Sequence, residues 1–240
     1  MMQTMTVHFV ETMRGHGAAI VPQAIGAGTP VGNTTTRPPH RRETEDDRLV
    51  GQTLVQALQE GCAFPLALRQ IAVTVNTAAS TDDGGLRGTI ESGIVEAKGL
   101  DEQALVIQRG EFELLSEATG GERRMRYRLY CWTPNGQRGF FLYGFKRIAN
   151  QSGKPLLLAI WRETTTLYVS VYELAAPGAG ALAEQSGQLV ATGVIRIHWA
   201  DFAWQLLTFR SHGASGVSGH VRNMWAFARF FIAALASVYL

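Results

Sequence analysis

The sequence predicts a mainly β protein, either an antiparallel β-barrel or a β-sandwich, with a few flanking helices that include a C-terminal one. Three observations support this prediction. Short runs of alternating apolar and polar residues recur from Glu111 to His198, turn-forming residues separate them, and most runs have one apolar face. With 46% hydrophobic residues there is enough material for a sizeable core, so we expect residues 1–240 to form a single β domain.

The N-terminal part predicts one strand, one long loop and one helix. Thr6 to Thr12 alternates weakly and predicts a strand. Residues 15–48 are rich in Gly, Ala, Pro and Thr and end in a mixed-charge stretch, so we expect a long loop or lid. Arg48 to Cys62 carries its apolar residues on one helical stripe and predicts a helix that stops near Gly61.

The rest of the chain predicts a series of strands followed by helices. Pro134-Asn135-Gly136 predicts a hairpin turn, and residues 200–240 predict a helical segment packed on the barrel, with helices over Asp201–Arg210 and Val221–Leu240. Strands are expected over Leu66–Val75, Thr89–Ala97, Ala104–Gln108, Glu111–Ser116, Arg124–Trp132, Arg138–Ile148, Leu156–Arg162, Thr164–Glu173 and Leu189–His198.

The alternation does not say which strand face points inward. A sandwich with one wet face shows this pattern, and so does a barrel whose interior holds a ligand by polar handles. Closure into a lipocalin-like barrel is favoured because it removes exposed strand edges.

Bulk charge and cysteine content exclude several function classes. The net charge is only +2 with no block of Lys and Arg, so we expect no nucleic-acid partner. Two cysteines and no recognisable secretion signal predict reduced thiols in a cytoplasmic protein. Met224–Leu240 is apolar but interrupted by Arg229. We interpret it first as a packed helix and second as an interfacial membrane helix, and do not expect a membrane-surface partner.

Known cofactor and metal motifs are absent from the sequence. It contains no Walker-type or dinucleotide-binding loop, and neither Cys62 nor Cys131 has metal-ligand spacing with a histidine. We therefore expect no cofactor and no metal.

Three residues are candidates for acid–base chemistry. His198 and Asp201 lie where a strand runs into a helix, so His198 is a candidate general acid or base oriented by a carboxylate. The alternative is that Asp201 only caps the helix or lies in its first turn. Tyr168 is a candidate hydrogen-bond donor to a carbonyl, and simple cross-strand packing is the alternative.

The strand faces that carry aromatic, hydroxyl and arginine side chains are the candidate ligand-binding surface. Solvated arginines and cross-strand aromatic packing are the alternatives. The candidates are Arg126, Arg128, Tyr130, Trp132, Tyr143, Thr166 and Tyr172.

A set of motifs gives the sequence a family resemblance. In order they are Glu11–Gly15, Gly110–Leu115, Met125–Leu129, Gly144–Lys146, Thr164–Leu167 and Gly193–His198, the last followed by Asp201-Phe202 and Gln205-Leu206. Together they resemble the accessory, non-flavin region of bacterial cholesterol-oxidase-like oxidoreductases of the glucose-methanol-choline type. The resemblance covers Val7 to Tyr239, and Pro22–Arg48 departs from it.

The resemblance implies a lipophilic context rather than an activity. The flavin domain's glycine fingerprint is missing, so oxidoreductase chemistry does not carry over. We expect the chain to bind a sterol-, terpenoid- or polyketide-like small molecule in a barrel pocket, with cofactor-independent isomerase or cyclase activity as an extension. The alternative is a non-catalytic accessory or interaction module for a flavin oxidoreductase. The sequence leaves open whether the chain has an oxidoreductase partner and whether it forms a homodimer.

Overall fold

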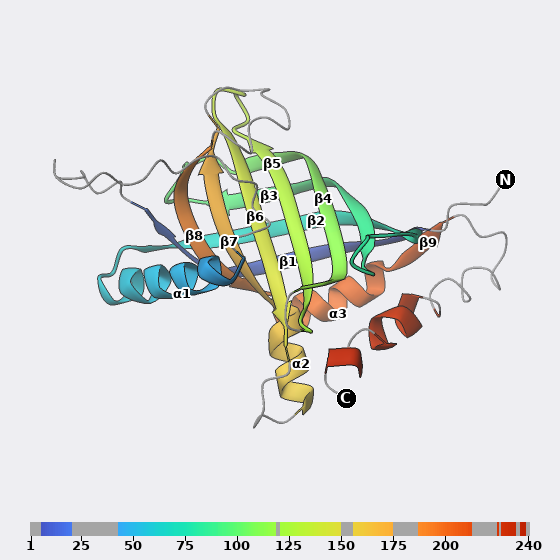
Figure 1. The fold of residues 1–240 in the computed structure, drawn as a ribbon. Coiled ribbons are helices and arrows are strands. Elements are labelled where there is room, and N and C mark those ends of the chain that lie inside the picture. Colours follow the sequence, from blue (N-terminus) through green and yellow to red (C-terminus); the bar gives the residue numbers. More distant parts are fainter. Residues whose placement is uncertain are drawn as a thin grey trace.

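A computed structural model of the chain shows a closed antiparallel barrel of eight strands (Figure 1). The structure describes residues 6–20, 43–118, 121–149, 156–174, 187–212, 225, 227–233 and 236–238. The barrel strands are β1 (Thr6–Ala19), β2 (Ala63–Ser80), β3 (Leu86–Ala97), β4 (Leu105–Glu117), β5 (Arg123–Trp132), β6 (Gly139–Ile148), β7 (Thr166–Glu173) and β8 (Gln188–Arg196).

Each strand pairs with the next along the chain, and β1 pairs with both β2 and β8. This second pairing of β1 closes the sheet, so the fold is a barrel and not a sandwich. A short strand, β9 (Arg210–His212), pairs with Thr6–His8 of β1. The register therefore leaves residues 9–13 of β1 without a strand partner between β8 and β9.

The barrel interior is apolar and receives side chains from all eight strands. One buried cluster joins, for example, Met13 of β1, Val73 of β2, Phe112 of β4 and Leu142 of β6. Strict alternation explains this, because every second side chain of a barrel strand points inward.

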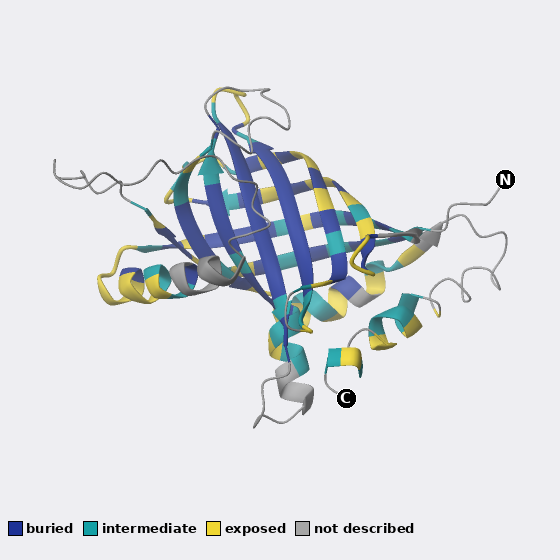
Figure 2. Ribbon diagram, viewed as in Figure 1, coloured by how far each residue is buried: buried dark blue, intermediate teal, exposed yellow. Residues whose placement is uncertain are grey.

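The outer face is not uniform around the barrel. On β3 the burial alternates along the strand, whereas β5 and β6 are buried at nearly every position (Figure 2). A second cluster covers the outer face of β5, β6 and β7, formed by Tyr130, Phe141, Tyr143, Phe145 and Leu174, with Trp132, Tyr168 and Tyr172 packed against it.

The helices lie outside the barrel wall. They are α1 (Glu43–Gln59), α2 (Leu156–Thr165) and α3 (Trp199–Thr208), and residues 225, 227–233 and 236–238 are helical near the C-terminus. The hydroxyl of Thr208 donates to the carbonyl of Gln205 and accepts from the amide of Val10 at 2.9 Å, so α3 lies over the part of β1 that no strand covers on that side. No helix among the described residues is long and apolar enough to cross a membrane.

Two of the strand predictions need correction. Leu156–Arg162 was predicted as a strand and is the start of helix α2, because a short apolar run fits either structure and periodicity cannot separate them. Ala104–Gln108 and Glu111–Ser116 were predicted as two strands and are one strand, β4, whose irregular register between Ile107 and Arg109 shifts the alternation.

The predicted loop over residues 15–48 is shorter than expected at both ends. Strand β1 continues to Ala19, and helix α1 begins at Glu43. Gly15 and Gly17 lie inside β1, where a Cβ on Gly15 would come within 2.2 Å of the Val194 carbonyl oxygen. Glycine here permits close strand contact rather than a loop. Residues 21–42 of this prediction lie outside the described residues.

Candidate functional site: a carboxylate, an ammonium and a phenol inside the barrel

Three polar side chains meet in the apolar interior of the barrel. They are Glu11 of β1, Tyr127 of β5 and Lys146 of β6, and each is 1–2% exposed. In the strand order, β1 and β5 stand opposite each other, so the group spans the interior rather than following one wall. We call Glu11, Tyr127 and Lys146 the interior triad.

Each oxygen of the Glu11 carboxylate accepts one hydrogen bond. Lys146 Nζ donates to Oε1 at 2.6 Å, and the Tyr127 hydroxyl donates to Oε2 at 2.8 Å. Lys146 Nζ also lies 5.3 Å from the centre of the Tyr127 ring, within the range of a cation–π contact. The triad has one negative charge, one positive charge and one neutral donor, so it is neutral overall.

Strand geometry explains why these residues meet. Tyr127 lies opposite Gly144 on β6, and Lys146 is two residues beyond that glycine on the same inward face. The β1–β2 ladder is irregular beside Glu11, between Glu11 and Met13, and Gln70 of β2 has a φ of +52° there. Bulges and left-handed non-glycine residues are features that concentrate near functional sites.

The surroundings of the triad are apolar and keep the phenol protonated. Phe112 packs on Tyr127 with ring centres 4.8 Å apart, and Phe9 packs edge-on against Phe112. Burial raises the pKa of Tyr127 well above its ordinary value, and the nearby negative charge of Glu11 and the hydrogen bond to it raise it further. Tyr127 is therefore a proton donor in this site.

The energetics of the triad argue against a purely stabilising role. Removing two charges from water costs several kcal/mol per ion, roughly what their attraction returns, and apolar replacements of similar volume are often neutral or stabilising. Apolar side chains at these positions would be enough to pack the interior. The charged groups of the triad therefore indicate a role beyond stability.

The structure places the predicted ligand-binding residues on the outer face of the barrel. Arg126, Arg128, Tyr130 and Trp132 alternate with the inward Tyr127 and Leu129 on β5, and Tyr143, Thr166 and Tyr172 lie on the outer face of β6 and β7. These side chains therefore do not line the barrel interior, contrary to the expectation that they surround a ligand there. They are buried or half-buried all the same, so they are not a solvated face either.

The outer-face arginines bind a glutamate of the neighbouring strand. Glu113 of β4 accepts from Arg128 Nη1 at 2.8 Å through Oε1 and from Arg126 Nη1 at 3.1 Å through Oε2. Burial by itself would raise the pKa of Glu113, but the two arginines outweigh it and lower the pKa below its usual 4.5. These two ion pairs connect β4 to β5 and are typical of a structural ion network.

The predicted catalytic residues do not converge. His198 is exposed and occupies the N-cap position of α3 without a capping hydrogen bond from its side chain. Asp201 lies in the first helical turn, as predicted, and forms an ion pair with Arg14 at 3.1 Å. Tyr168 lies on β7, where its ring stacks on Phe145 with centres 5.5 Å apart. None of the three lines the barrel interior, and a role for any one of them in acid–base chemistry stays a prediction.

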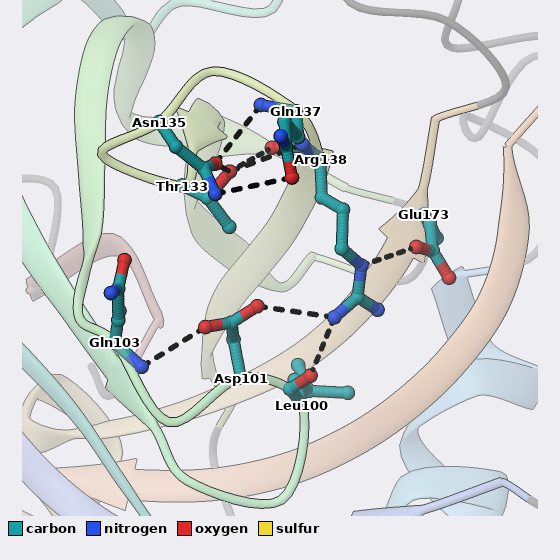
Figure 3. A network of polar contacts seen from close by, with 8 residues as sticks. All are labelled: Leu100, Asp101, Gln103, Thr133, Asn135, Gln137, Arg138 and Glu173. Atoms are coloured by element: carbon teal, nitrogen blue, oxygen red, sulfur yellow. Dashed lines mark hydrogen bonds and ion pairs between the residues drawn. The ribbon is translucent and has the colours of Figure 1, made fainter.

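A polar network lies at one end of the barrel, around Arg138 (Figure 3). Arg138, at the end of the β5–β6 hairpin, bonds to Asp101 at 3.1 Å, to the carbonyl of Leu100 and to Glu173 at 2.9 Å. An open depression of about 520 Å³ lies beside it, lined by residues 98–103, Asn135 and Arg138. Because Arg138 holds two turns and the end of β7 together, we assign the network a structural role.

No cluster among the described residues resembles a metal or thiol site. No three His, Cys, Asp or Glu side chains of that part of the chain are placed to hold a metal ion. Both cysteines are free, Cys62 exposed and Cys131 buried. Burial raises the pKa of the Cys131 thiol, so the reactive thiolate is disfavoured.

The sequence carries a signal for the interior triad, although neither Glu11 nor Lys146 is among the predicted site residues. Glu11 interrupts the apolar positions of β1 that Val7, Phe9 and Met13 occupy, and Lys146 does the same on β6. A charged residue on the apolar face of a strand is informative because it is seldom buried without a partner. Both residues belong to motifs quoted above for the family resemblance.

No family model, no curated protein and no solved structure matches the chain.

Proposed function

We propose that the barrel binds an uncharged lipophilic small molecule in its interior and that the interior triad fixes the orientation of that molecule. The observation that carries the proposal is the convergence of Glu11, Lys146 and Tyr127 from opposite walls of an apolar interior. Ligand sites are mostly apolar and contain a few placed polar groups.

Hydrogen-bonding capacity indicates which ligand group would bind. An ammonium has three donors, and within the described residues Lys146 donates one of them, to Glu11. The others can bind a carbonyl or hydroxyl oxygen. Because the triad is already neutral, a charged ligand would bring an uncompensated charge into the interior, so the ligand is an uncharged ketone or alcohol.

The binding proposal can be tested with Nile red, an uncharged lipophilic ketone that fluoresces in apolar surroundings. We expect the protein to bind Nile red and progesterone to displace it. The variant Glu11→Leu with Lys146→Met and Tyr127→Phe should lose at least about tenfold in affinity for progesterone, as expected when a bond from a charged donor is removed.

The control must distinguish ligand binding in the barrel interior from binding to the exposed apolar side chains of α3. Trp204 and Leu207 of α3 are exposed, so Trp204→Ser with Leu207→Ser should leave displaceable binding unchanged. If progesterone fails to displace the dye, or if the α3 variant alone abolishes binding, the interior is not the site. The non-catalytic accessory module would then be the better proposal.

A second candidate function is cofactor-independent isomerisation. It rests on one carboxylate that contacts two proton donors at 2.6 and 2.8 Å. With a β,γ-unsaturated ketone bound, Glu11 would take a proton from the carbon between the carbonyl and the double bond, while Lys146, which has donors beyond the one that it gives to Glu11, donates a hydrogen bond to the developing enolate oxygen. Glu11 would then return the proton to another carbon, which moves a double bond without oxidation or reduction.

This candidate can be tested with a β,γ-unsaturated steroid ketone, whose conversion to the conjugated enone raises ultraviolet absorbance. We expect turnover by the wild type and none by Glu11→Gln, which keeps the size of the side chain but removes the base. Equal rates for both proteins would contradict a role for Glu11 as the base.

A further inference from the structure

Among the described residues, five of the nine exposed large apolar side chains lie on α3 and the C-terminal helix. Among the residues of α3 whose burial is described, the exposed ones are Trp199, Ala200, Ala203, Trp204 and Leu207, which are all apolar. At 100° per residue these five positions form one continuous stripe of the helix. We call this stripe the tryptophan face, and its three large side chains are 65–68% exposed.

The opposite side of α3 holds the helix on the barrel. Phe202 packs against the barrel core, and Gln205 is buried. Just beyond the helix, Phe209 stacks on Phe9 with ring centres 5.0 Å apart. A helix that is apolar on both its packed side and its outer side is unusual at a surface exposed to water alone.

Neighbouring helices extend and stiffen this surface. Trp161 of α2 stacks on Trp199 with ring centres 3.6 Å apart and planes 6° apart. The C-terminal helix lies beside α3, where Phe227 contacts Phe209 (Figure 1). It exposes Trp225, Arg229 and Ile232 at helical spacing.

The charge around the tryptophan face is positive. From residue 196 onward the described residues contain three arginines and one acidic residue. The acidic residue, Asp201, is neutralised by Arg14. Arg196, Arg210 and Arg229 are exposed and lie on or next to the two helices.

We propose that the tryptophan face docks the protein on the surface of an anionic lipid bilayer. Exposed tryptophans together with arginines are the composition found at membrane interfaces, where the rings lie at headgroup depth and the cations attract acidic lipids. A symmetric contact between two copies fits less well, because it would bring the same arginines of both copies together.

The position of the face suits a protein that exchanges lipophiles with a bilayer. Helix α3 lies over residues 9–13 of β1, the stretch that carries Glu11 and has no strand partner on that side. Docking goes beyond the proposed ligand binding and does not depend on it. Docking on a bilayer also favours an interfacial membrane helix over a packed helix for the apolar region Met224–Leu240.

The test is flotation with vesicles of phosphatidylcholine alone and of phosphatidylcholine mixed with phosphatidylglycerol. We expect the protein to float with the anionic vesicles, to bind the neutral ones less, and to be released by added salt, since salt screens the arginines. Tryptophan emission should shift to shorter wavelength on binding. The variant Trp204→Ser with Leu207→Ser should lose at least about tenfold in partitioning, as expected for two apolar side chains no longer buried.

The matched control removes exposed apolar side chains from another helix. Val55→Ser with Leu58→Ser on α1 changes two residues that are 55% and 52% exposed and should leave partitioning unchanged. Circular dichroism checks that every variant is folded. Failure of the folded wild type to bind anionic vesicles, or equal binding by the α3 variant, overturns the proposal. A dimer in light scattering that the α3 variant dissociates would assign the face to a second copy instead.

Discussion

Glu11 is stable in the barrel interior only because of its two partners. Glu11 is 1% exposed, and both of its carboxylate oxygens accept hydrogen bonds, one from an ammonium and one from a phenol. A buried charge without such partners costs several kcal/mol, whereas a buried pair can be replaced by apolar side chains at little cost. Single and combined substitutions in the triad should therefore change the free energy of unfolding by different amounts.

We predict that substitutions in the triad are strongly non-additive. Lys146→Met alone leaves the Glu11 carboxylate buried without its cation and should lower the free energy of unfolding by about 3–5 kcal/mol. Adding Glu11→Leu and Tyr127→Phe removes the remaining polar groups and should restore most of that loss. Urea denaturation of the wild type, the single variant and the triple variant measures this coupling. Additive losses would show that the three residues do not form one unit.

Strands β4 and β5 are joined on their outer face by Glu113, which binds both Arg126 and Arg128. The aromatic side chains of β5, β6 and β7 pack around them, and Arg109 lies 4.3 Å from the ring centre of Tyr130. The pairing of Glu113 with both arginines favours a structural role for this network, whereas Arg128 Nη2 and Thr166 Oγ1 of the same face have no hydrogen-bond partner among the described residues.

We predict that this ion network makes stability depend on pH. The pKa of Glu113 is lower in the folded protein than its usual 4.5, so its contribution is present at neutral pH and is lost as the pH falls through the lowered value. Glu113→Gln should reduce the free energy of unfolding by about 2 kcal/mol at pH 7. The difference from the wild type should shrink toward pH 3, as urea denaturation at both pH values would show.

A control on the same strand is Glu111→Gln. The Glu111 side chain is 70% exposed and its carboxylate lies 3.9 Å from Arg128, so we expect a change within about 0.5 kcal/mol at either pH. An equal loss in both variants would mean that general charge, rather than the Glu113 network, determines the acid sensitivity.

Closure of the barrel depends on the contact between β1 and β8. Gly17 and Gly193 are paired across this contact, and their strands approach closely. A Cβ on Gly193 would come within 2.6 Å of the Leu66 side chain and 2.9 Å of the His16 carbonyl oxygen. Because neither the backbone nor the packed interior can move freely, glycine is required at this position.

We predict that Gly193→Ala destabilises the protein by about 1–3 kcal/mol, the usual cost of overpacking a core. The matched control is Gly51→Ala in helix α1, where a Cβ would meet no atom within 4 Å. This change should stabilise the protein by about 0.5–1 kcal/mol, because alanine favours helix over glycine. Thermal unfolding compares the two, and a Gly193→Ala variant as stable as the wild type would show that the closing contact tolerates a side chain.

The sequence by itself determined the strand content, the Pro134-Asn135-Gly136 turn, the first helix in outline and the C-terminal helix. These features depend on patterns that repeat every two or 3.6 residues and on turn-forming residues. A short stretch of sequence contains such signals, so it is enough to predict them. The same local rules could not decide the helix over Leu156–Thr165, because a short apolar run fits a strand and a helix equally well.

Only the tertiary structure decided which face of each strand points inward, and with it the site. Alternation defines two faces but not their direction, so Arg126, Tyr143 and Tyr172 were expected around the ligand and lie on the outer wall instead. Glu11 and Lys146 are 135 residues apart, and they meet because closure of the sheet brings β1 and β6 around one interior. Closure is a long-range property of eight strands together, and no local window of the sequence contains it.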